Sequence, residues 1–470
     1  MNKIPTFALV GAPNDGKSTV VSTLSFDPTV AISPISGFTI ETKGFSFQFD
    51  GREIIRFYDT PGFQQAEYLL KWLDRQADAE TAAEGVIPRR FIEEHKRNET
   101  YDHECQLMGP LADGAAIVYI VDGGRPIEVN DKATVKILQA CGTQRFAIIN
   151  PKGAEKGNIK EWENYLRQKF TYVETFHATM AGFEDIIGFL ETIAPVTGKW
   201  KEEMREVIAK MKLKREDQIE GQAASIIGLL EQALSIRVEL PVANSGKDYL
   251  RAKLEDKVKA SVHKLEASFR KETRERFNHG NAEIKLPSLI DLDFFHEKVR
   301  KTLGLTTEQL VLAGAAIGFA IGLCVDASTS GFLFGIPTLL STAAGALFAW
   351  YLSDEGIRIG IPLEVLGVKL KGEDFATANI DPKSNTPWIL LDRAIAYSKI
   401  LSARAHGNRE ESCIDDKDIK CTTRWPSEQR DIFSKLLGFL AGKGSEEQLH
   451  EAKTKAKKIL VQELNNKQEE

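Results

Sequence analysis

Short apolar runs bounded by turn residues alternate with segments of helical periodicity as far as residue 198. A chain that alternates strand and helix in this way builds a mostly parallel sheet with helices on both faces. The pattern therefore predicts an α/β domain over residues 1–198. The runs that we expect to form strands are 7–10, 44–49, 53–58, 115–121, 146–150 and 172–176.

Beyond this domain the periodicity is mainly helical. Apolar residues recur three or four positions apart among charged ones in residues 199–237 and 247–277, which predicts amphipathic helices. We expect these helices to pack into a bundle or onto the first domain, and pairing with a second copy of the chain is the alternative. Residues 388–404 predict another helix, whose Arg393 and Arg404 we place on a solvated face.

Residues 309–352 are the most apolar stretch of the chain. Their only charged residue is Asp326, which lies in a polar turn between two apolar arms. Glycines on one helical face let two helices approach closely in lipid, and they recur here at Gly314, Gly318 and Gly322. Trp350 and Tyr351 at the end of the second arm are typical of a membrane interface. We expect a helical hairpin in the membrane. The short first arm and Pro337 favour the alternative, a buried helix pair in a soluble domain.

The clearest chemical motif lies between the first predicted strand and the helix after it. Residues 11–18 read GAPNDGKS, a complete GxxxxGK[ST] phosphate-binding loop in the strand–turn–helix context that this motif requires. Lys17 can reach the β- and γ-phosphates, and the Ser18 hydroxyl can ligate Mg²⁺. The candidate nucleotide-binding residues of the loop are Asn14, Asp15, Gly16, Lys17, Ser18 and Thr19.

A second motif follows the strand at 53–58. Asp59, Thr60, Pro61 and Gly62 form a DxxG element, in which Asp59 can hold Mg²⁺ and the Gly62 amide can contact the γ-phosphate. A switch threonine that ligates Mg²⁺ is expected between the two motifs. We choose Thr39, and Thr42 is the alternative. The charged residues 64–109 are either an element that responds to the nucleotide or a surface insertion.

These motifs together resemble the Era-like (TrmE/Era) branch of the translation-factor GTPases. The resemblance implies hydrolysis of GTP to GDP with Mg²⁺, with Lys17, Thr39 and Gly62 acting on the γ-phosphate. It also implies that Asn14 is a candidate ligand for a catalytic K⁺. Phe63 stands where many small GTPases carry a water-orienting glutamine. The whole layout is similar to a bacterial family that joins such a domain to a C-terminal domain of unknown function with a Gly-rich hydrophobic segment.

The guanine-reading element departs from the pattern of this branch. The strand at 146–150 ends in Asn150, Pro151, Lys152 and Gly153, where Asn-Lys-x-Asp is expected. Only Asn150 fits, and Gly153 has no carboxylate to accept hydrogen bonds from guanine. The preference for guanine is therefore left open. The backbone of Ala178, after the strand at 172–176, is the candidate for the last base-contacting element.

Composition sets the remaining limits. The chain has 470 residues, and we divide it into 1–198, 199–308, 309–352 and 353–470. Its net charge of −6 argues against nucleic acid as a partner. The five cysteines show no metal-ligand or CxxC spacing, and they indicate reduced thiols. No signal peptide precedes the first strand.

We therefore expect a Mg²⁺-dependent nucleoside-triphosphate hydrolase whose nucleotide state controls a membrane-associated helical region. Its expected place is the cytoplasmic side of the inner membrane, with lipid and a second copy of the chain as partners. A dynamin-like enzyme that remodels membranes is one alternative. A soluble Era-like factor for RNA or ribosome assembly, located in the cytoplasm, is the other.

Overall fold

The computed structural model describes the chain in several stretches and divides it into two compact units. The described residues are 4–26, 41–76, 83–142, 144–152, 157–241, 247–279, 369–371, 375–384, 386–406, 408 and 421–466. One unit comprises Met1–Asp217, Asn278–Ala282 and Ala403–Glu410, and the other comprises Gln218–Phe277, Glu283–Ser402 and Glu411–Glu470. The hairpin predicted at 309–352 lies outside the described residues.

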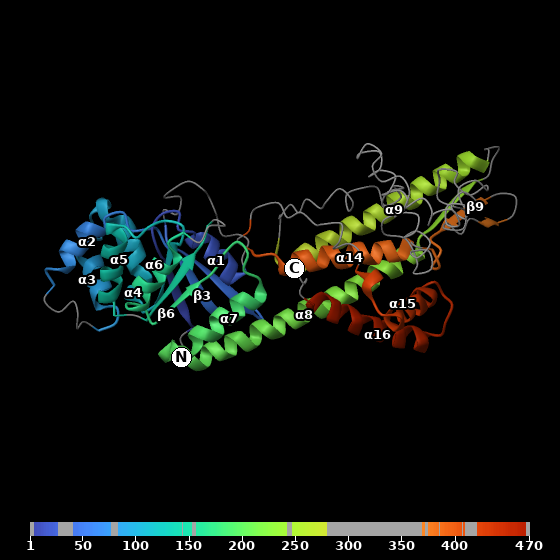
Figure 1. Ribbon diagram of the computed structural model, residues 1–470. Helices are drawn as coiled ribbons and strands as arrows, with labels where there is room; N and C mark the ends of the chain where they lie inside the picture. The colour runs from blue at the N-terminus through green and yellow to red at the C-terminus, as the bar shows by residue number, and fades with distance from the viewer. Residues whose placement is uncertain are drawn as a thin grey trace, which may run out of the picture. The chain divides into compact units, whose positions relative to one another are not determined.

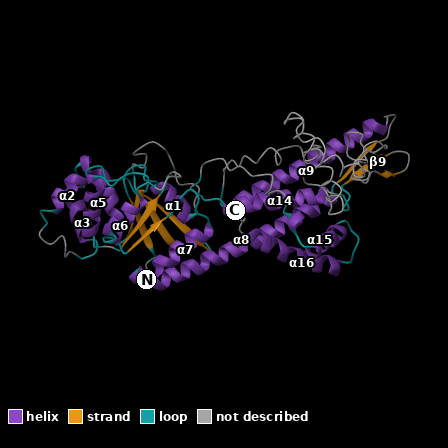
Figure 2. Cartoon of the chain, viewed as in Figure 1, coloured by secondary structure: helices purple, strands orange, loops and turns teal. Residues whose placement is uncertain are grey.

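A six-stranded sheet forms the centre of the first unit (Figures 1 and 2). Its strand order is β2-β3-β1-β4-β5-β6, in which β2 is antiparallel to β3 and the other neighbours are parallel. The strands are β1 (Thr6–Val10), β2 (Lys43–Phe49), β3 (Arg52–Asp59), β4 (Ala116–Asp122), β5 (Arg145–Asn150) and β6 (Tyr172–Thr175). All six predicted strands are confirmed to within one residue at each end.

Helices cover both faces of this sheet because successive strand residues point to opposite sides. Phe7 and Leu9 face the core shared with α1 (Lys17–Ser25), α7 (Phe183–Ile193) and the start of α8 (Lys201–Ser235). Ala8 and Val10 face the other core. That core is shared with α2 (Ala66–Leu73), α3 (Val86–His95), α4 (Asp102–Ala112), α5 (Val129–Ala140) and α6 (Ile159–Arg167). Strands buried on both faces explain the nearly continuous apolar runs in the sequence.

The charged segment after Gly62 folds into helices rather than an irregular loop. It contains α2, α3, the 3₁₀ turn η1 (Glu99–Tyr101) and α4. Aromatic rings hold these elements together. The Tyr68 ring of α2 stacks on the Tyr101 ring of η1 with their centroids 4.4 Å apart, and the Trp72 ring of α2 meets the Phe91 ring of α3 edge-on at 5.1 Å. This segment therefore packs onto the sheet through the core that it shares with α5 and α6, and α4 leads directly into β4.

The second unit is mainly helical, with a small sheet. Its helices are the part of α8 from Gln218 onward, α9 (Lys247–Arg276), α14 (Thr386–Ala403), α15 (Ser427–Leu440) and α16 (Glu446–Asn465). The antiparallel sheet has the order β7-β9-β8, with β7 (Arg237–Pro241), β8 (Lys369–Lys371) and β9 (Phe375–Asn379). The short 3₁₀ turn η4 (Thr422–Arg424) also belongs to this unit, whereas η2 (Ala194–Val196) and η3 (Gly198–Trp200) precede α8 in the first unit. The predicted helices at 199–237, 247–277 and 388–404 are confirmed.

Several polar groups lie inside the second unit. Arg393 of α14 is 3% exposed and pairs with Glu266 of α9, with Nε 2.7 Å from Oε1. The prediction of a solvated face was therefore wrong for Arg393, because α14 is surrounded by other helices and its cation is neutralised inside the core. Gln222 of α8 donates from Nε2 to the hydroxyls of Thr273 and Ser398, at 2.9 and 2.8 Å. Such paired groups tolerate burial because their hydrogen bonds replace those to water.

Candidate functional site

The phosphate-binding loop lies at the carboxyl end of β1, where ligands bind in open parallel sheets. Asn14 and Gly16 have positive φ angles of 70° and 93°, which turn the loop tightly before α1 begins at Lys17. A side chain at Gly16 would also meet the amide of Asn150 at 2.4 Å. Glycine is therefore required at this position by both backbone conformation and space. The loop leads directly into the N-terminus of α1, a favourable place for an anion.

Three of the predicted residues converge beside this loop. The Ser18 hydroxyl donates to Asp59 Oδ2 at 2.6 Å, so that side-chain oxygen atoms from α1 and the end of β3 lie together. Lys17 Nζ donates to the carbonyls of Gly11 and Ala12 at 3.2 and 2.9 Å. Burial lowers the pKa of Lys17, and the carboxylates of Asp59 and Asp15 oppose that shift.

Gly62 of the DxxG element packs directly against the phosphate-binding loop. A Cβ atom at Gly62 would lie 2.8 Å from Pro13 Cδ and 2.9 Å from the Gly11 carbonyl. This close approach explains why glycine is needed at the position. It also places the Gly62 backbone beside the loop that is expected to hold the phosphates.

Asp15 of the phosphate-binding loop forms an ion pair with Arg125 that the sequence did not reveal. Arg125, which follows β4, donates from Nη2 to Asp15 Oδ2 at 3.1 Å and from Nη1 to Asp131 Oδ2 at 2.6 Å. Asp131 in the first turn of α5 also accepts from the Tyr119 hydroxyl. Burial raises the pKa of Asp15, and the hydrogen bond from Arg125 opposes that shift.

Asn150 joins the loop to the last predicted element. Its Nδ2 donates to the Asp15 carbonyl at 3.2 Å, and its Oδ1 accepts from the Ala178 amide at 3.3 Å. The Ala178 carbonyl in turn accepts from Thr23 of α1 at 2.8 Å. The structure thus brings the two base-side candidates together. Gly153 lies outside the described residues, while the Lys152 Nζ is 3.8 Å from Asp122 Oδ2.

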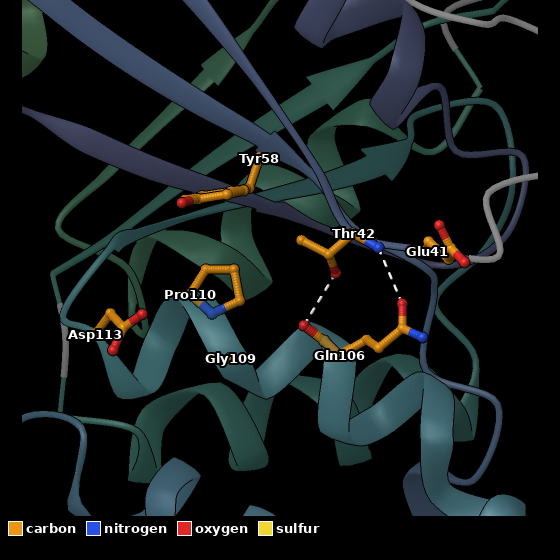
Figure 3. Close-up of a pocket in the computed structure, with 7 residues that line it drawn as sticks. All are labelled: Glu41, Thr42, Tyr58, Gln106, Gly109, Pro110 and Asp113. Carbon is orange, nitrogen blue, oxygen red and sulfur yellow. Dashed lines mark hydrogen bonds between the residues drawn. The ribbon is translucent and has the colours of Figure 1, made fainter.

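The structure describes only one of the two candidate switch threonines. Thr39 lies outside the described residues, so its role stays a prediction. Thr42 is held by α4: its hydroxyl donates to the Gln106 carbonyl at 2.9 Å, and its amide donates to Gln106 Oε1 at 3.0 Å (Figure 3). These contacts line an open pocket of about 440 Å³ between the start of β2, Tyr58 of β3 and α4. In this arrangement the Thr42 hydroxyl is hydrogen-bonded to the backbone of α4.

Two family models match successive parts of the chain, and the second match begins within the first unit. Residues 164–466, more than half of the 470, match the domain of unknown function DUF3482. The chain belongs to the DUF3482 family. Residues 6–150 match the family described as 50S ribosome-binding GTPase. Together with the relatives below, this match confirms that the first domain is an Era/TrmE-like P-loop GTPase domain.

The curated relatives match only part of this chain. GTPase Der from Hyphomonas neptunium is 27% identical over 129 residues, which are 27% of this chain and 25% of that protein. GTPase Der from Lachnospira eligens is 27% identical over 161 residues, which are 33% of this chain and 36% of that protein. The tRNA modification GTPase MnmE from Nitratiruptor sp. is 21% identical over 150 residues, or 32% of this chain and 27% of that protein. The chain thus spans about a quarter to a third of the length of these relatives.

Two solved structures of Era also match loosely. One is a complex with MgGDPNP and part of 16S ribosomal RNA, at 14% identity and a TM-score of 0.29, covering 60% of this chain and 91% of that one. The other is a variant of Era from Aquifex aeolicus bound to GDP and aluminium fluoride, with the same identity and TM-score, covering 58% and 89%. Superpositions of this quality carry no argument about partners.

No helix within the described stretches is sufficiently long and apolar to cross a bilayer. The predicted hairpin at 309–352 is not among those stretches, so membrane insertion stays a prediction.

Sequence reasoning missed three residues that shape the site: Glu104, Gln106 and Arg125. None of them lies in a recognisable motif, because each acts through a contact that only folding creates.

Proposed function

We propose that the protein hydrolyses GTP with Mg²⁺ as cofactor and that its nucleotide state controls the helical second unit. The observation that carries the proposal is the contact of the Ser18 hydroxyl with Asp59 Oδ2 at 2.6 Å beside the phosphate-binding loop. A chance phosphate-loop motif would not bring these two residues together from α1 and β3. The name shared by the Der and MnmE relatives, GTPase, supports the same activity.

The residues present fit a magnesium ion. Mg²⁺ prefers hard oxygen ligands and is commonly bound through one or two protein oxygens together with substrate phosphates and water. The Ser18 hydroxyl and the Asp59 carboxylate supply such oxygens, and no group of three His, Cys, Asp or Glu side chains suited to another metal occurs among the described residues. The bound ion would neutralise charge on the transferred phosphoryl group.

The chain's own groups act on the phosphates. Nucleotide binding would exchange the contacts of Lys17 Nζ with the Gly11 and Ala12 carbonyls for contacts with phosphate oxygens. The loop amides, Lys17 and the Gly62 amide would then stabilise the charge that develops on the γ-phosphate in the transition state. Phe63 cannot orient the attacking water, and its side chain packs on the apolar core beneath it.

Guanine is the base that we propose, although the carboxylate of the usual reading element is missing. Asn150 still connects the loop with Ala178, which keeps the base side of the site assembled. The test is a binding titration of the full chain with GDP, ADP and XDP. We expect GDP to bind at least tenfold more tightly than the other two, since a site that hydrogen-bonds one base rejects analogues by about that factor or more.

Lys17→Ala provides the control for this titration. Removing the ammonium should abolish nucleotide binding, because no other described cation lies on the loop carbonyls. Equal affinities for GDP and ADP would overturn guanine specificity. Unchanged hydrolysis by Lys17→Ala would overturn the site itself.

The finer parts of the function rest on the sequence. We propose that residues 309–352 bind inner-membrane lipid from the cytoplasmic side, that Thr39 completes the Mg²⁺ ligands and that Asn14 holds K⁺. Self-association through the amphipathic helices would make the protein dynamin-like. The description "50S ribosome-binding GTPase" favours a soluble ribosome-associated factor as the second candidate.

A further inference from the structure

The helix α4 contacts the chain immediately after the DxxG element. Glu104 of this helix accepts hydrogen bonds at Oε1 from the amides of Gln64 and Gln65, at 3.0 and 2.7 Å. These two amides follow Gly62 by two and three residues, and Gly62 lies against the phosphate-binding loop. One carboxylate oxygen therefore fixes the backbone that positions Gly62.

The contact between Glu104 and the two amides lies inside the protein rather than on its surface. The side chain is 1% exposed, although it is acidic. Two amide donors satisfy Oε1, whereas Oε2 is buried with no hydrogen-bond partner among the described residues. An acidic side chain retained at this cost points to a specific role for its contact with the two amides. Its place in the first turn of α4 adds the favourable potential of the helix N-terminus.

The same helix also holds the segment that enters β2. Gln106, two residues after Glu104, accepts two hydrogen bonds from Thr42 (Figure 3). Its carbonyl accepts from the Thr42 hydroxyl, and its Oε1 accepts from the Thr42 amide. Thr42 ends the stretch 36–42 in which the first switch is predicted. One turn of α4 thus makes four hydrogen bonds to two chain segments that are far apart in sequence.

We propose that Glu104 and Gln106 are positioning residues that hold both switches against α4 for hydrolysis of GTP. The inference rests on the proposed function. Glu104 holds the backbone that follows Gly62, and Gly62 lies beside the phosphate-binding loop, so that less ordering of this segment is needed in the transition state.

The test compares Glu104→Gln with Glu93→Gln in the full chain. Glu104→Gln keeps the shape but weakens both hydrogen bonds to the switch amides, whereas Glu93 is exposed on α3 of the same segment. We expect kcat for GTP to fall about tenfold in Glu104→Gln. The dissociation constant for GDP should stay within about threefold of the parent value, since Lys17 and the loop are untouched. Glu93→Gln should match the parent in both.

Gln106→Ala supplies a second, milder variant. It removes the Oε1 acceptor of the Thr42 amide but leaves the backbone carbonyl that accepts the Thr42 hydroxyl. Its kcat should fall less than that of Glu104→Gln, again with GDP affinity preserved. An unchanged kcat in Glu104→Gln, or an equal loss of kcat and GDP affinity, would overturn the positioning role. A parent protein that neither binds nor hydrolyses GTP would instead overturn the proposed function.

Discussion

Arg125 shows how one side chain can support a nucleotide site without contacting the ligand. Its guanidinium lies between Asp15 of the phosphate-binding loop and Asp131 of α5, and it stacks over Trp162 with 5.4 Å between its Cζ and the ring centroid. The forked, planar guanidinium suits such a bridge, which a lysine could not make in the same way. The loop is thereby tied to the helix that follows β4.

We predict that Arg125→Met loosens the phosphate-binding loop. The change leaves Asp15 buried without its cation, and breaking a buried pair from one side typically costs several kcal/mol; with Arg125 24% exposed, we expect about 2 kcal/mol. Hydrogen exchange of peptides from the loop should accelerate accordingly. Asp15→Asn combined with Arg125→Met should regain part of the protection, because the unpaired charge in the loop is gone and only that of Asp131 remains.

Arg167→Met is the matched control for this prediction. Arg167 lies on α6, is 66% exposed and pairs with Glu163 at 3.6 Å. Exposed pairs contribute at most about 1 kcal/mol, so exchange in the loop should not change. Equal exchange in Arg125→Met and the parent protein would show that the bridge does not hold the loop.

At the scale of elements, α14 shows the limit of reading helices from periodicity. Nearly every side chain of α14 is buried, including Asp392 and Arg393, so no apolar stripe separates a wet face from a dry one. Asp392 accepts from the Thr422 amide at 2.7 Å and from its hydroxyl at 3.0 Å. Burial raises the pKa of Asp392 from 3.8 to about 7, although both hydrogen bonds oppose the shift.

This pKa predicts how the stability of the second unit depends on pH. Asp392 is protonated in the folded chain up to pH about 7 and ionised in the unfolded chain above pH about 4. Its contribution to stability is therefore fully present below pH 4, declines as pH rises toward 7 and is absent above that. The total change is at most about 4 kcal/mol.

Asp392→Asn should remove this dependence and stabilise the protein at pH 8, while Asp256→Asn, an exposed position on α9, should do neither. The measurement is the unfolding temperature of each variant from pH 4.5 to pH 8. Parallel curves for Asp392→Asn and the parent protein would contradict the assignment.

At the scale of the whole molecule, the two units differ in what their sequences reveal. The parallel strands β1, β4 and β5 follow from their apolar runs, because they are buried on both faces of the sheet. The edge strand β2 is antiparallel to β3, and only Phe47 of its residues is buried. The pairing of β7 with β9 joins residues about 140 positions apart, and no local sequence pattern predicts this pairing. The buried pair of Glu266 with Arg393 depends on the same long-range packing.

The hairpin at 309–352 leads to a prediction for the intact protein. If it inserts in lipid, the full chain should remain in the membrane pellet after extraction with alkaline carbonate, and deletion of residues 309–352 should release it. Recovery of the full chain in the carbonate supernatant would contradict insertion. Co-sedimentation with ribosomes in that case would support the ribosome-associated alternative.

The sequence by itself determined the phosphate-binding loop, the DxxG element, the strands between them and the family, because each depends on residues close together in the chain. It also located Asn150 as the surviving part of the base-reading element. Only the tertiary structure decided that Arg125 braces Asp15 and that Glu104 and Gln106 of α4 hold both switches. Those contacts join residues that are distant in the chain, and polar side chains carry no periodic signal of the partner that folding brings to them.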